Sequence, residues 1–308
     1  MLTENECEYM KNSNIHANAA PKKKIRGLKR KLIQIAAFGF TNSHIPNFMS
    51  GRLYTGKWKE FCVPGLNCYS CPAATFACPI GALQAVTGSR KFPISFYVFG
   101  LLLAFGVIFG RAVCGFLCPF GLLQELLAKV PFPKKKLPAF MRYIKYLILI
   151  VFVLILPIVL TVGPAGVPAF CKYICPVGTL EGGLPALLTQ PSIRSMLGPL
   201  FSWKIGILVA VIFLCMFVHR FFCKVLCPLG AIYGLLNKVS IVRLRVDHGK
   251  CIHCRACERT CKMDVYPVMH PDSAECIRCG DCAQICPKGA ITVGAGPVRF
   301  EKDPTQAS

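Results

Sequence analysis

The sequence predicts an α-helical polytopic membrane protein of about four spans, followed by a small cysteine-rich C-terminal domain. Three observations predict this class. The 308 residues are 54% hydrophobic and 16% charged, with a mean hydropathy of +0.51, whereas a soluble domain carries about 25% charged residues. Long uncharged segments alternate with basic ones along the first 245 residues. Eight of the 20 cysteines are concentrated between residues 251 and 286.

The C-terminal cysteines form two runs of equal spacing. They read Cys251-x2-Cys254-x2-Cys257-x3-Cys261 and Cys276-x2-Cys279-x2-Cys282-x3-Cys286-Pro287. This spacing is typical of bacterial two-cluster ferredoxins, in which the fourth cysteine of each run ligates the cluster of the other run. It predicts one [4Fe–4S] cluster on Cys251, Cys254, Cys257 and Cys286, and a second on Cys276, Cys279, Cys282 and Cys261. A structural zinc site also gathers thiolates, but it fits two evenly spaced runs poorly. Lys262 follows Cys261 where the motif has proline, which affects the loop and not the number of ligands.

The charge balance indicates a lipid partner. The net charge is +22, from 36 basic and 14 acidic residues. In so apolar a chain, this excess points to anionic headgroups and positive-inside loops, and not to nucleic acid. The spacing of the cysteines favours metal ligands in a reducing setting over a disulfide framework.

Four units are expected along the chain: a basic cytoplasmic tail at 1–31, a membrane domain at 32–245, an α+β two-cluster ferredoxin domain at 246–295 and a tail at 296–308. The membrane domain is expected to span the bilayer at residues 32–49, 92–110, 146–162 and 205–218. Re-entrant segments around 73–86 and 170–188 remain open. The connection 111–145 carries seven Lys/Arg and one acidic residue, whereas 164–204 carries three Lys/Arg. Both termini are therefore expected on the cytoplasmic side of the cell (inner) membrane.

A Cys-Pro motif follows each expected span. Three copies have the form Cys-x3-Cys-Pro-x-Gly, beginning at Cys114, Cys171 and Cys223, and a longer version runs from Cys62 to Gly81. Two expected spans and two motifs make up each half, about 32–130 and 143–240. This pattern predicts an internal two-span repeat whose halves share one orientation.

The motifs after the second and fourth expected spans should meet at the cytoplasmic face. Proline is favoured in the first turn of a helix, so Cys118 and Cys227 are expected to be N-cap residues. Helix N-termini favour anionic ligands, and Arg111 and Arg220 add positive charge nearby. We therefore expect Cys114, Cys118, Cys223 and Cys227 to hold one further [4Fe–4S] cluster. The alternative is that they are small buried residues in helices.

The opposite face receives six cysteines, two more than one cube requires. We expect ligation by Cys68, Cys71 and Cys78 with one or both of Cys171 and Cys175, and Cys62 is an additional candidate. A pair of clusters and disulfides are the open alternatives. Cys215 is expected to serve packing. His44 and His219 lie on different expected spans, which disfavours a b-type haem.

With these motifs in view, the chain resembles the polyferredoxin-type membrane proteins of the NapH/NosR group, which include a quinol-dehydrogenase-like subunit of periplasmic nitrate reduction and the membrane half of a nitrous-oxide reduction protein. The resemblance covers the chain from Lys29 onward and implies electron transfer at the inner membrane. The extracytoplasmic flavin domain of the NosR type has no counterpart here. The block 62–81 and the pair Cys171 and Cys175 are additional to the simplest members, so donor and acceptor do not carry over.

No catalytic residue is expected, because the sequence contains no nucleophile–base pair, paired catalytic carboxylates or phosphate loop. The leading prediction is a non-catalytic subunit that carries electrons from a cytoplasmic donor to a membrane or extracytoplasmic partner: a flavoprotein, a reductase or quinone. Two alternatives remain open: a quinol-oxidising subunit of a reductase system, and an iron–sulfur redox sensor or maturation protein.

Overall fold

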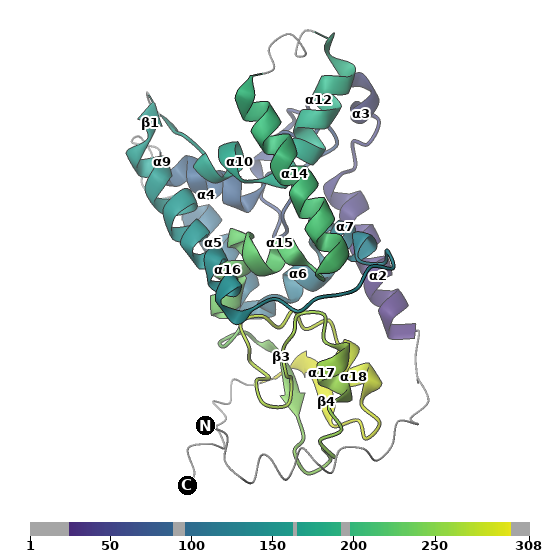
Figure 1. Ribbon diagram of the computed structural model, residues 1–308. Coiled ribbons are helices and arrows are strands. Elements are labelled where there is room, and N and C mark those ends of the chain that lie inside the picture. Colours follow the sequence, from purple (N-terminus) through teal and green to yellow (C-terminus); the bar gives the residue numbers. More distant parts are fainter. Residues whose placement is uncertain (1–24, 89–95, 163–164, 192–197, 297–308) are drawn as a thin grey trace.

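The structure, a computed structural model, describes residues 25–88, 96–162, 165–191 and 198–296. Helices form an elongated bundle, and a small C-terminal domain packs against one end of it (Figure 1). Most of the predicted N-terminal tail and the predicted C-terminal tail lie outside the described residues.

Two helices in the described residues are long and apolar enough to cross a membrane, Ala139–Val159 and Pro199–Phe217. The second is α14, one regular helix. The first consists of η2 (Ala139–Tyr143), α8 (Ile144–Ile148), the π-helical η3 (Leu149–Ile155) and α9 (Leu156–Val159). Pro157 explains the irregular stretch, because it has no N–H to donate to the preceding turn.

The other two expected spans are not confirmed. Helix α5 (Phe96–Phe109) is apolar, but its described part is 14 residues long. Helix α2 (Ile25–Thr41) begins with a basic turn and ends eight residues before the expected end at residue 49. The Thr41 hydroxyl donates to the Ala37 carbonyl at 2.9 Å, and a turn then leads to α3 (Asn47–Ser50). The segment 32–49 is therefore not one continuous helix.

The Cys-Pro motifs build four similar corners. In each, proline is the first residue of a helix and the preceding cysteine is its N-cap, as predicted for Cys118 and Cys227. The four helices are α4 (Pro79–Thr87), α7 (Pro119–Leu127), α11 (Pro176–Gly178), which continues through η4 (Thr179–Gly183) into α12 (Leu184–Thr189), and α16 (Pro228–Leu236). A five-residue helix precedes three of them: α6 (Ala112–Phe116), α10 (Ala169–Tyr173) and α15 (Phe221–Val225).

The C-terminal domain combines two strands and two short helices. Strands β3 (Val242–Val246) and β4 (Ile291–Ala295) pair antiparallel, with Leu244 opposite Val293. Helices α17 (Ala256–Thr260) and α18 (Asp281–Ile285) each follow one cysteine loop and pack against each other. The remaining elements are η1 (Lys57–Glu60) and a hairpin of β1 (Thr161–Val162) and β2 (Ala165–Gly166) at the far end of the bundle.

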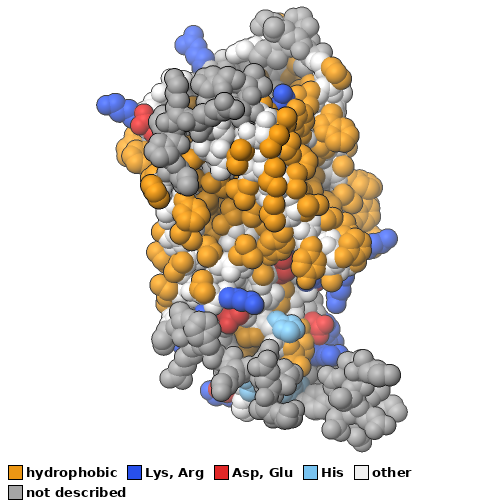
Figure 2. Space-filling view, turned by 90° about the vertical axis from the view of Figure 1, so that its left-hand side faces the viewer, with side chains coloured by type: hydrophobic (Ala, Val, Ile, Leu, Met, Phe, Trp, Pro, Cys, Tyr) orange, Lys and Arg blue, Asp and Glu red, His pale blue; other side chains and the backbone are white. Residues whose placement is uncertain are grey.

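One face of the bundle is largely apolar: Figure 2 shows a broad band of hydrophobic side chains across its middle, with most charged side chains towards the two ends. Both long helices expose large apolar side chains, such as Leu147 and Val209, which are 62% and 59% exposed. A contiguous apolar surface of this kind marks contact with lipid or with another protein.

Candidate metal centres

Two cavities in the C-terminal domain are each lined by four cysteines. One is lined by Cys251, Cys254, Cys257 and Cys286. The other is lined by Cys261, Cys276, Cys279 and Cys282. The fourth cysteine of each run thus lines the cavity of the other run, which is the crossed arrangement that the spacing predicts.

The backbone of these loops is bent at matched positions. In the first run, His253 and Arg255 have positive φ angles of 51° and 56°; in the second, Arg278 and Gly280 have 51° and 78°. Residues other than glycine rarely adopt this conformation, and it concentrates at functional sites. Alternating left- and right-handed residues turn successive N–H groups towards one centre, which suits an anionic group.

A third set of cysteines lies at the end of the bundle that faces the C-terminal domain. Cys114, Cys118, Cys223 and Cys227 come from the second and fourth corners and are 4–5% exposed. Burial, and then the charges on Cys223 and Cys114, raise the pKa of the Cys118 thiol to about 12. Burial, then Cys223, Cys114 and Cys118, also raise the pKa of Cys227. The two corners are in contact, because Arg220 Nη1 donates to the Cys114 carbonyl at 2.7 Å, and the mutual effects of the thiols agree with this proximity. We name the four cysteines the inner set.

Several donors face the thiols of the inner set. The Gly230 N–H donates to Cys227 Sγ at 3.3 Å, and Gln124 Nε2 donates to Cys223 Sγ at 3.1 Å. Burial raises the pKa of the Cys114 thiol, while the charges of Arg111 and Arg220 oppose this effect. These donors and positive charges offset part of the cost of burying a thiolate, the form that binds iron.

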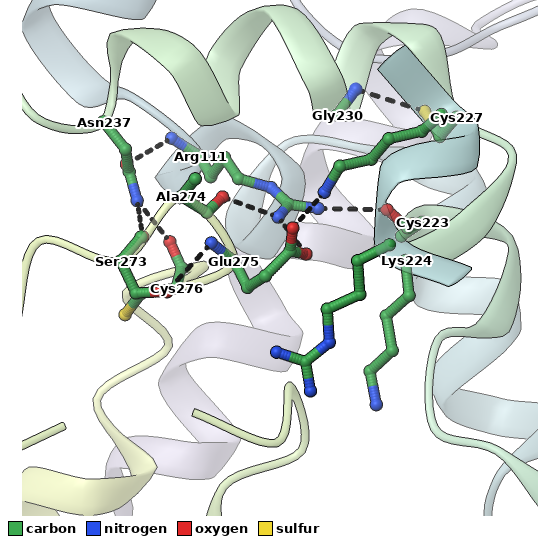
Figure 3. A network of polar contacts seen from close by, with 12 residues as sticks. Arg111, Cys223, Lys224, Cys227, Gly230, Asn237, Ser273, Ala274, Glu275 and Cys276 are labelled. Atoms are coloured by element: carbon green, nitrogen blue, oxygen red, sulfur yellow. Dashed lines mark hydrogen bonds and ion pairs between the residues drawn. The ribbon is translucent and has the colours of Figure 1, made fainter. Parts of the chain in front are cut away.

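Glu275 links the inner set to the C-terminal domain, as Figure 3 shows. Its carboxylate accepts from Arg111 Nη1 at 2.7 Å and from Lys145 Nζ. Arg111 also donates to the Ala274 carbonyl at 2.7 Å and to the Cys223 carbonyl at 3.0 Å. One guanidinium thus contacts the loop of Cys276 and the backbone of the inner set.

A fourth set lies deeper in the bundle and is formed by Cys68, Cys78, Cys171 and Cys175. Burial raises the pKa of Cys175, and charges on Cys171, Cys68 and Cys78 add to this effect. The third corner lies against the Cys68 thiol, because a Cβ on Gly178 would be 3.6 Å from Cys68 Sγ. We name these four residues the outer set.

The two remaining cysteines of the 62–81 block are placed differently. Cys71 is close enough to Cys68 for their charges to interact, but its Sγ lies 3.9 Å from the Asn42 Oδ1 atom. Cys62 is packed in the apolar core, and its backbone N–H donates to the Tyr97 hydroxyl at 3.2 Å. Cys215 is buried in α14, and His44 stacks on Tyr54 with 4.0 Å between ring centroids.

Comparison with known proteins adds an independent observation. A family model described as a 4Fe-4S binding domain matches four successive segments, residues 75–95, 92–139, 146–185 and 200–246. A second 4Fe-4S binding domain model matches residues 269–292. Each of the first four segments contains one Cys-Pro corner. No solved structure matches the chain.

Several curated proteins are similar to the chain. Uncharacterized protein MJ0749 of Methanocaldococcus jannaschii is 30% identical over 210 residues, which are 64% of this chain and 69% of the relative. MJ0750 of the same organism is 32% identical over 193 residues, 60% of this chain and 73% of the relative. Regulatory protein NosR of Pseudomonas aeruginosa is 30% identical over 192 residues, 58% of this chain and 24% of NosR.

The chain belongs to the NapH/NosR-type polyferredoxin family. The resemblance seen in the motifs is thereby confirmed, and the protein is an iron–sulfur electron-transfer protein.

Each cavity of the C-terminal domain of this polyferredoxin is lined by four thiols, the number of ligands that one [4Fe–4S] cube takes. Within the described ranges, no group of three or more His, Cys, Asp or Glu side chains is close enough to hold one metal ion. A cube distributes four thiolates over separate irons, so its ligands stand further apart than those of a single ion. Every cysteine in the described part of the chain has a free thiol.

The polyferredoxin also contains polar residues that the motifs alone did not reveal. Gln84 Nε2 donates to Cys171 Sγ at 3.2 Å, as Gln124 does to Cys223. Each glutamine stands six residues after the last cysteine of its corner. The same position holds Glu181 in the third corner and Tyr233 in the fourth. An alignment of the four corners would have shown that this position is always polar or hydroxylated.

Proposed function

We propose that the protein carries electrons across a cell membrane. The donor contacts the C-terminal domain in the cytoplasm, and the acceptor, a flavoprotein, a reductase or quinone, lies in the membrane or beyond it. Four [4Fe–4S] clusters, one on each cysteine set, would supply the one-electron sites. The single observation that carries the proposal is that the four sets follow one another from the C-terminal domain into the bundle.

The first two sets are adjacent within the C-terminal domain. Burial raises the pKa of the Cys282 thiol, and charges on neighbouring thiols, including Cys257 of the other cavity, add to the effect. The crossed fourth cysteines also connect the two cavities covalently, because Cys257 and Cys261 belong to one short helix and its end.

The second set is joined to the inner set by a buried ionic contact. Burial raises the pKa of the Cys276 thiol, and the charge of Arg111 is among the effects that oppose it. Arg111 in turn bonds the Cys223 carbonyl at 3.0 Å. On the other side, Lys224 forms a 2.6 Å ion pair with Asp264, next to the loop of Cys261. Buried ion pairs add little net stability, so their value here is that they fix the two parts in register.

Three features support a membrane location. Two helices of the described part of the chain are long and apolar enough to cross a bilayer, a band of hydrophobic side chains covers the face of the bundle drawn in Figure 2, and most charged side chains on that face gather towards the ends. The start of α2 lies at the same end as the C-terminal domain (Figure 1). This placement supports four membrane crossings with both termini in the cytoplasm. The two further spans would be α2 and α5, whose described helices are shorter than the two long ones.

A basic rim supports entry of electrons at the cavity of Cys251. Arg255 and Lys288 line this cavity, and both are exposed. Arg259 is exposed nearby and donates to the Cys254 carbonyl at 2.9 Å. Such a rim favours an acidic electron-carrier protein as the donor, because complementary charge raises the association rate.

Two measurements test the proposal. Anaerobically purified protein is expected to contain about 16 irons per chain, because each of four cubes holds four. A reproducible value of about eight would mean that the bundle sets are empty. In sealed vesicles, dithionite on the side of the C-terminal domain is expected to reduce ferricyanide on the other side. Unchanged transfer in the double variant Cys78→Ser and Cys175→Ser would exclude the outer set from the path.

A further inference from the structure

Buried cations gather where the C-terminal domain meets the end of the bundle, a region that we name the junction. Six lysine and arginine residues there are at most 3% exposed: Arg30, Arg111, Lys145, Arg220, Lys224 and Arg278. Burying a charge is costly unless an opposite charge lies beside it. The partners of these six side chains therefore show how the charge of the junction is balanced.

Two carboxylates of the junction are each shared by two of these cations. Glu125 forms ion pairs with Arg30 at 2.8 Å and with Arg220 at 2.6 Å. Glu275 is shared in the same way by the two cations that were described with Figure 3 above. One positive charge is left over in each group, because a single carboxylate balances only one of its two partners.

Arg278 adds a third unbalanced charge. Its guanidinium donates to three neutral oxygens, the carbonyls of Phe109 at 3.3 Å and Asn237 at 2.6 Å and the hydroxyl of Ser240. In the described part of the chain, no ion pair joins it to a carboxylate. Lys224 adds nothing to the surplus, since it pairs with Asp264 alone at 2.6 Å.

This surplus lies beside two of the four cysteine sets. Arg278 belongs to the loop between Cys276 and Cys279 and lines the second cavity of the C-terminal domain. Cys279 packs against the apolar core that contains cysteines of the inner set. Arg111 donates to the backbone of the inner set, at the Cys223 carbonyl. The second cavity and the inner set are thus next to buried positive charge.

The first cavity of the C-terminal domain has different surroundings. In its cysteine run, His253 occupies the position that corresponds to Arg278. The basic residues that line this cavity, Arg255 and Lys288, are exposed. Water and salt screen exposed charges, whereas buried charges are screened much less. The two cavities therefore have equivalent thiols but unequal electrostatic environments.

We propose that the surplus cations of the junction provide the counter-charge for clusters at the second cavity and the inner set, and hold electrons there in preference to the first cavity. A cube with four thiolate ligands is an anion, and each electron that it accepts makes it more negative. Buried cations stabilise this added charge, because the dielectric constant around them is low. The junction sites therefore have higher reduction potentials than the first site.

The cations also give the electron path a direction within the C-terminal domain. In the step from the first cavity to the second, the first site loses one electron and the second site gains it, and no bond forms or breaks. A higher potential at the second site makes this step favourable towards the bundle. The inference rests on the proposed function and deepens it.

The direct test neutralises Arg278. Arg278→Gln removes the positive charge and keeps an N–H donor in the same loop. The matched control is Arg243→Gln, because Arg243 is 6% exposed and also donates to backbone carbonyls, those of Lys238 at 2.9 Å and Ser240 at 3.3 Å. Arg243 is not among the residues that line the second cavity.

The readouts are iron content and an EPR-monitored redox titration of the full chain in detergent. Cys254→Ser, Cys279→Ser and Cys118→Ser identify the signals of the first, second and inner sites. In the unmodified chain, the second site is expected to become reduced before the first. At the potential at which that second site is half reduced, Arg278→Gln is expected to lower its ratio of reduced to oxidised form about tenfold. Equal changes in Arg278→Gln and Arg243→Gln, or reduction of the first site before the second, would overturn the inference.

A second variant keeps the test decisive if Arg278→Gln loses iron. Arg30→Gln combined with Lys145→Gln removes two surplus charges and leaves each shared carboxylate paired with one arginine, Arg220 or Arg111. Full iron content is expected, with a ratio of reduced to oxidised inner site that is lower by about tenfold. An unchanged ratio would reject the inference. Failure of electron transfer across vesicles would instead reject the proposed function, so the two can fail separately.

Discussion

Arg111 and Arg220 reach across the inner set to each other's cysteine motif. Arg111 Nη2 donates to the Cys223 carbonyl at 3.0 Å, and Arg220 Nη1 donates to the Cys114 carbonyl at 2.7 Å. Each arginine precedes its own first cysteine by three residues, so the contacts are related by the internal repeat. Each is also balanced by one buried carboxylate: Glu275 for Arg111 and Glu125 for Arg220. The two halves of the chain therefore hold each other's ligands in position.

This arrangement of the two arginines predicts that the Arg220→Gln variant no longer binds a cluster at the inner set. Glu125 would keep Arg30 as its ion-pair partner. Burial raises the pKa of Glu125, and the charge of Arg220 is the largest of the effects that hold it below its usual value. Breaking a buried pair costs about 3–5 kcal/mol. We expect loss of about four irons per chain, measured by iron analysis, and a lower thermal unfolding temperature. Lys250→Gln is the control, because the Lys250–Asp247 pair is largely exposed. Full iron content in the Arg220 variant would contradict this role.

The contact between bundle and C-terminal domain can be tested at Gly115. A Cβ there would lie 2.8 Å from the Ile277 carbonyl oxygen, in the loop between Cys276 and Cys279. Gly115→Ala is expected to destabilise the docked domain by about 1–3 kcal/mol, because overpacking forces backbone shifts. Limited proteolysis would then release the domain sooner. Gly100→Ala is the matched control, since a Cβ at Gly100 meets nothing within 4 Å. Equal cleavage rates in the two variants would argue against a rigid contact.

Hydrogen bonds to thiolate sulfur are expected to set the reduction potentials of the clusters at the inner and outer sets. Gln124→Leu removes the donor to Cys223, and Gln84→Leu removes the donor to Cys171. Each variant is expected to lower the reduction potential of its own site and to leave the other unchanged, since fewer hydrogen bonds disfavour the reduced cluster. Redox titration followed by EPR measures both. Gln34→Leu serves as the control, because Gln34 donates to the Gly115 carbonyl and not to sulfur. A shift of equal size in that control would assign the effect to packing.

Charge reversal of the basic rim is expected to slow electron entry. Arg255→Glu with Lys288→Glu should lower the second-order rate of reduction by an acidic two-cluster ferredoxin about tenfold, and high salt should remove most of the difference. Lys129→Glu with Lys136→Glu, two exposed changes in the segment after α7, lowers the net charge by the same amount away from the cavity. Stopped-flow absorbance at increasing ionic strength measures the rates. Equal rates for the rim and control variants at low salt would place the donor elsewhere.

The sequence predicts best where spacing alone determines the geometry. The runs at 251–286 line two cavities in the crossed pattern because a cube needs three thiolates from one tight loop. The N-cap role of Cys118 and Cys227 follows equally locally from the proline after each. The expected span 32–49 is not confirmed: its helix ends at Thr41, because the turn at residues 42–46 depends on distant partners, such as the pairing of the Thr75 N–H with the Thr41 carbonyl.

Tertiary contacts decide what spacing leaves open. Arg111 donates to the Cys223 carbonyl, and Gln84 donates to Cys171 Sγ. In both contacts the residues are more than 80 positions apart in the sequence. The block 62–81 is irregular, and Lys59 orders part of it by donating to the Ala74 carbonyl at 3.0 Å. No periodicity or motif in this block identifies which of its four cysteines face the third corner.

The ligands of the outer set can be separated by single Cys→Ser changes. The charges of the outer-set thiols raise one another's pKa values, which indicates that the thiols are close together. Replacing Cys78 is therefore expected to remove the cluster of this set, about four irons per chain. Cys62→Ser is the buried control, since Cys62 is 8% exposed and its thiol pKa is raised by burial alone. It is expected to keep full iron content.

Cys71→Ser decides between the two arrangements that the block allows. Its thiol lies beside Asn42 Oδ1 at 3.9 Å, so the serine hydroxyl could keep that contact, and we expect the iron content and the EPR signal of the outer site to be unchanged. Loss of about four irons in this variant, with retention in Cys175→Ser, would instead assign the site to Cys68, Cys71, Cys78 and Cys171. Mössbauer spectra of the purified variants, recorded anaerobically, would distinguish a lost cube from one with a serine ligand.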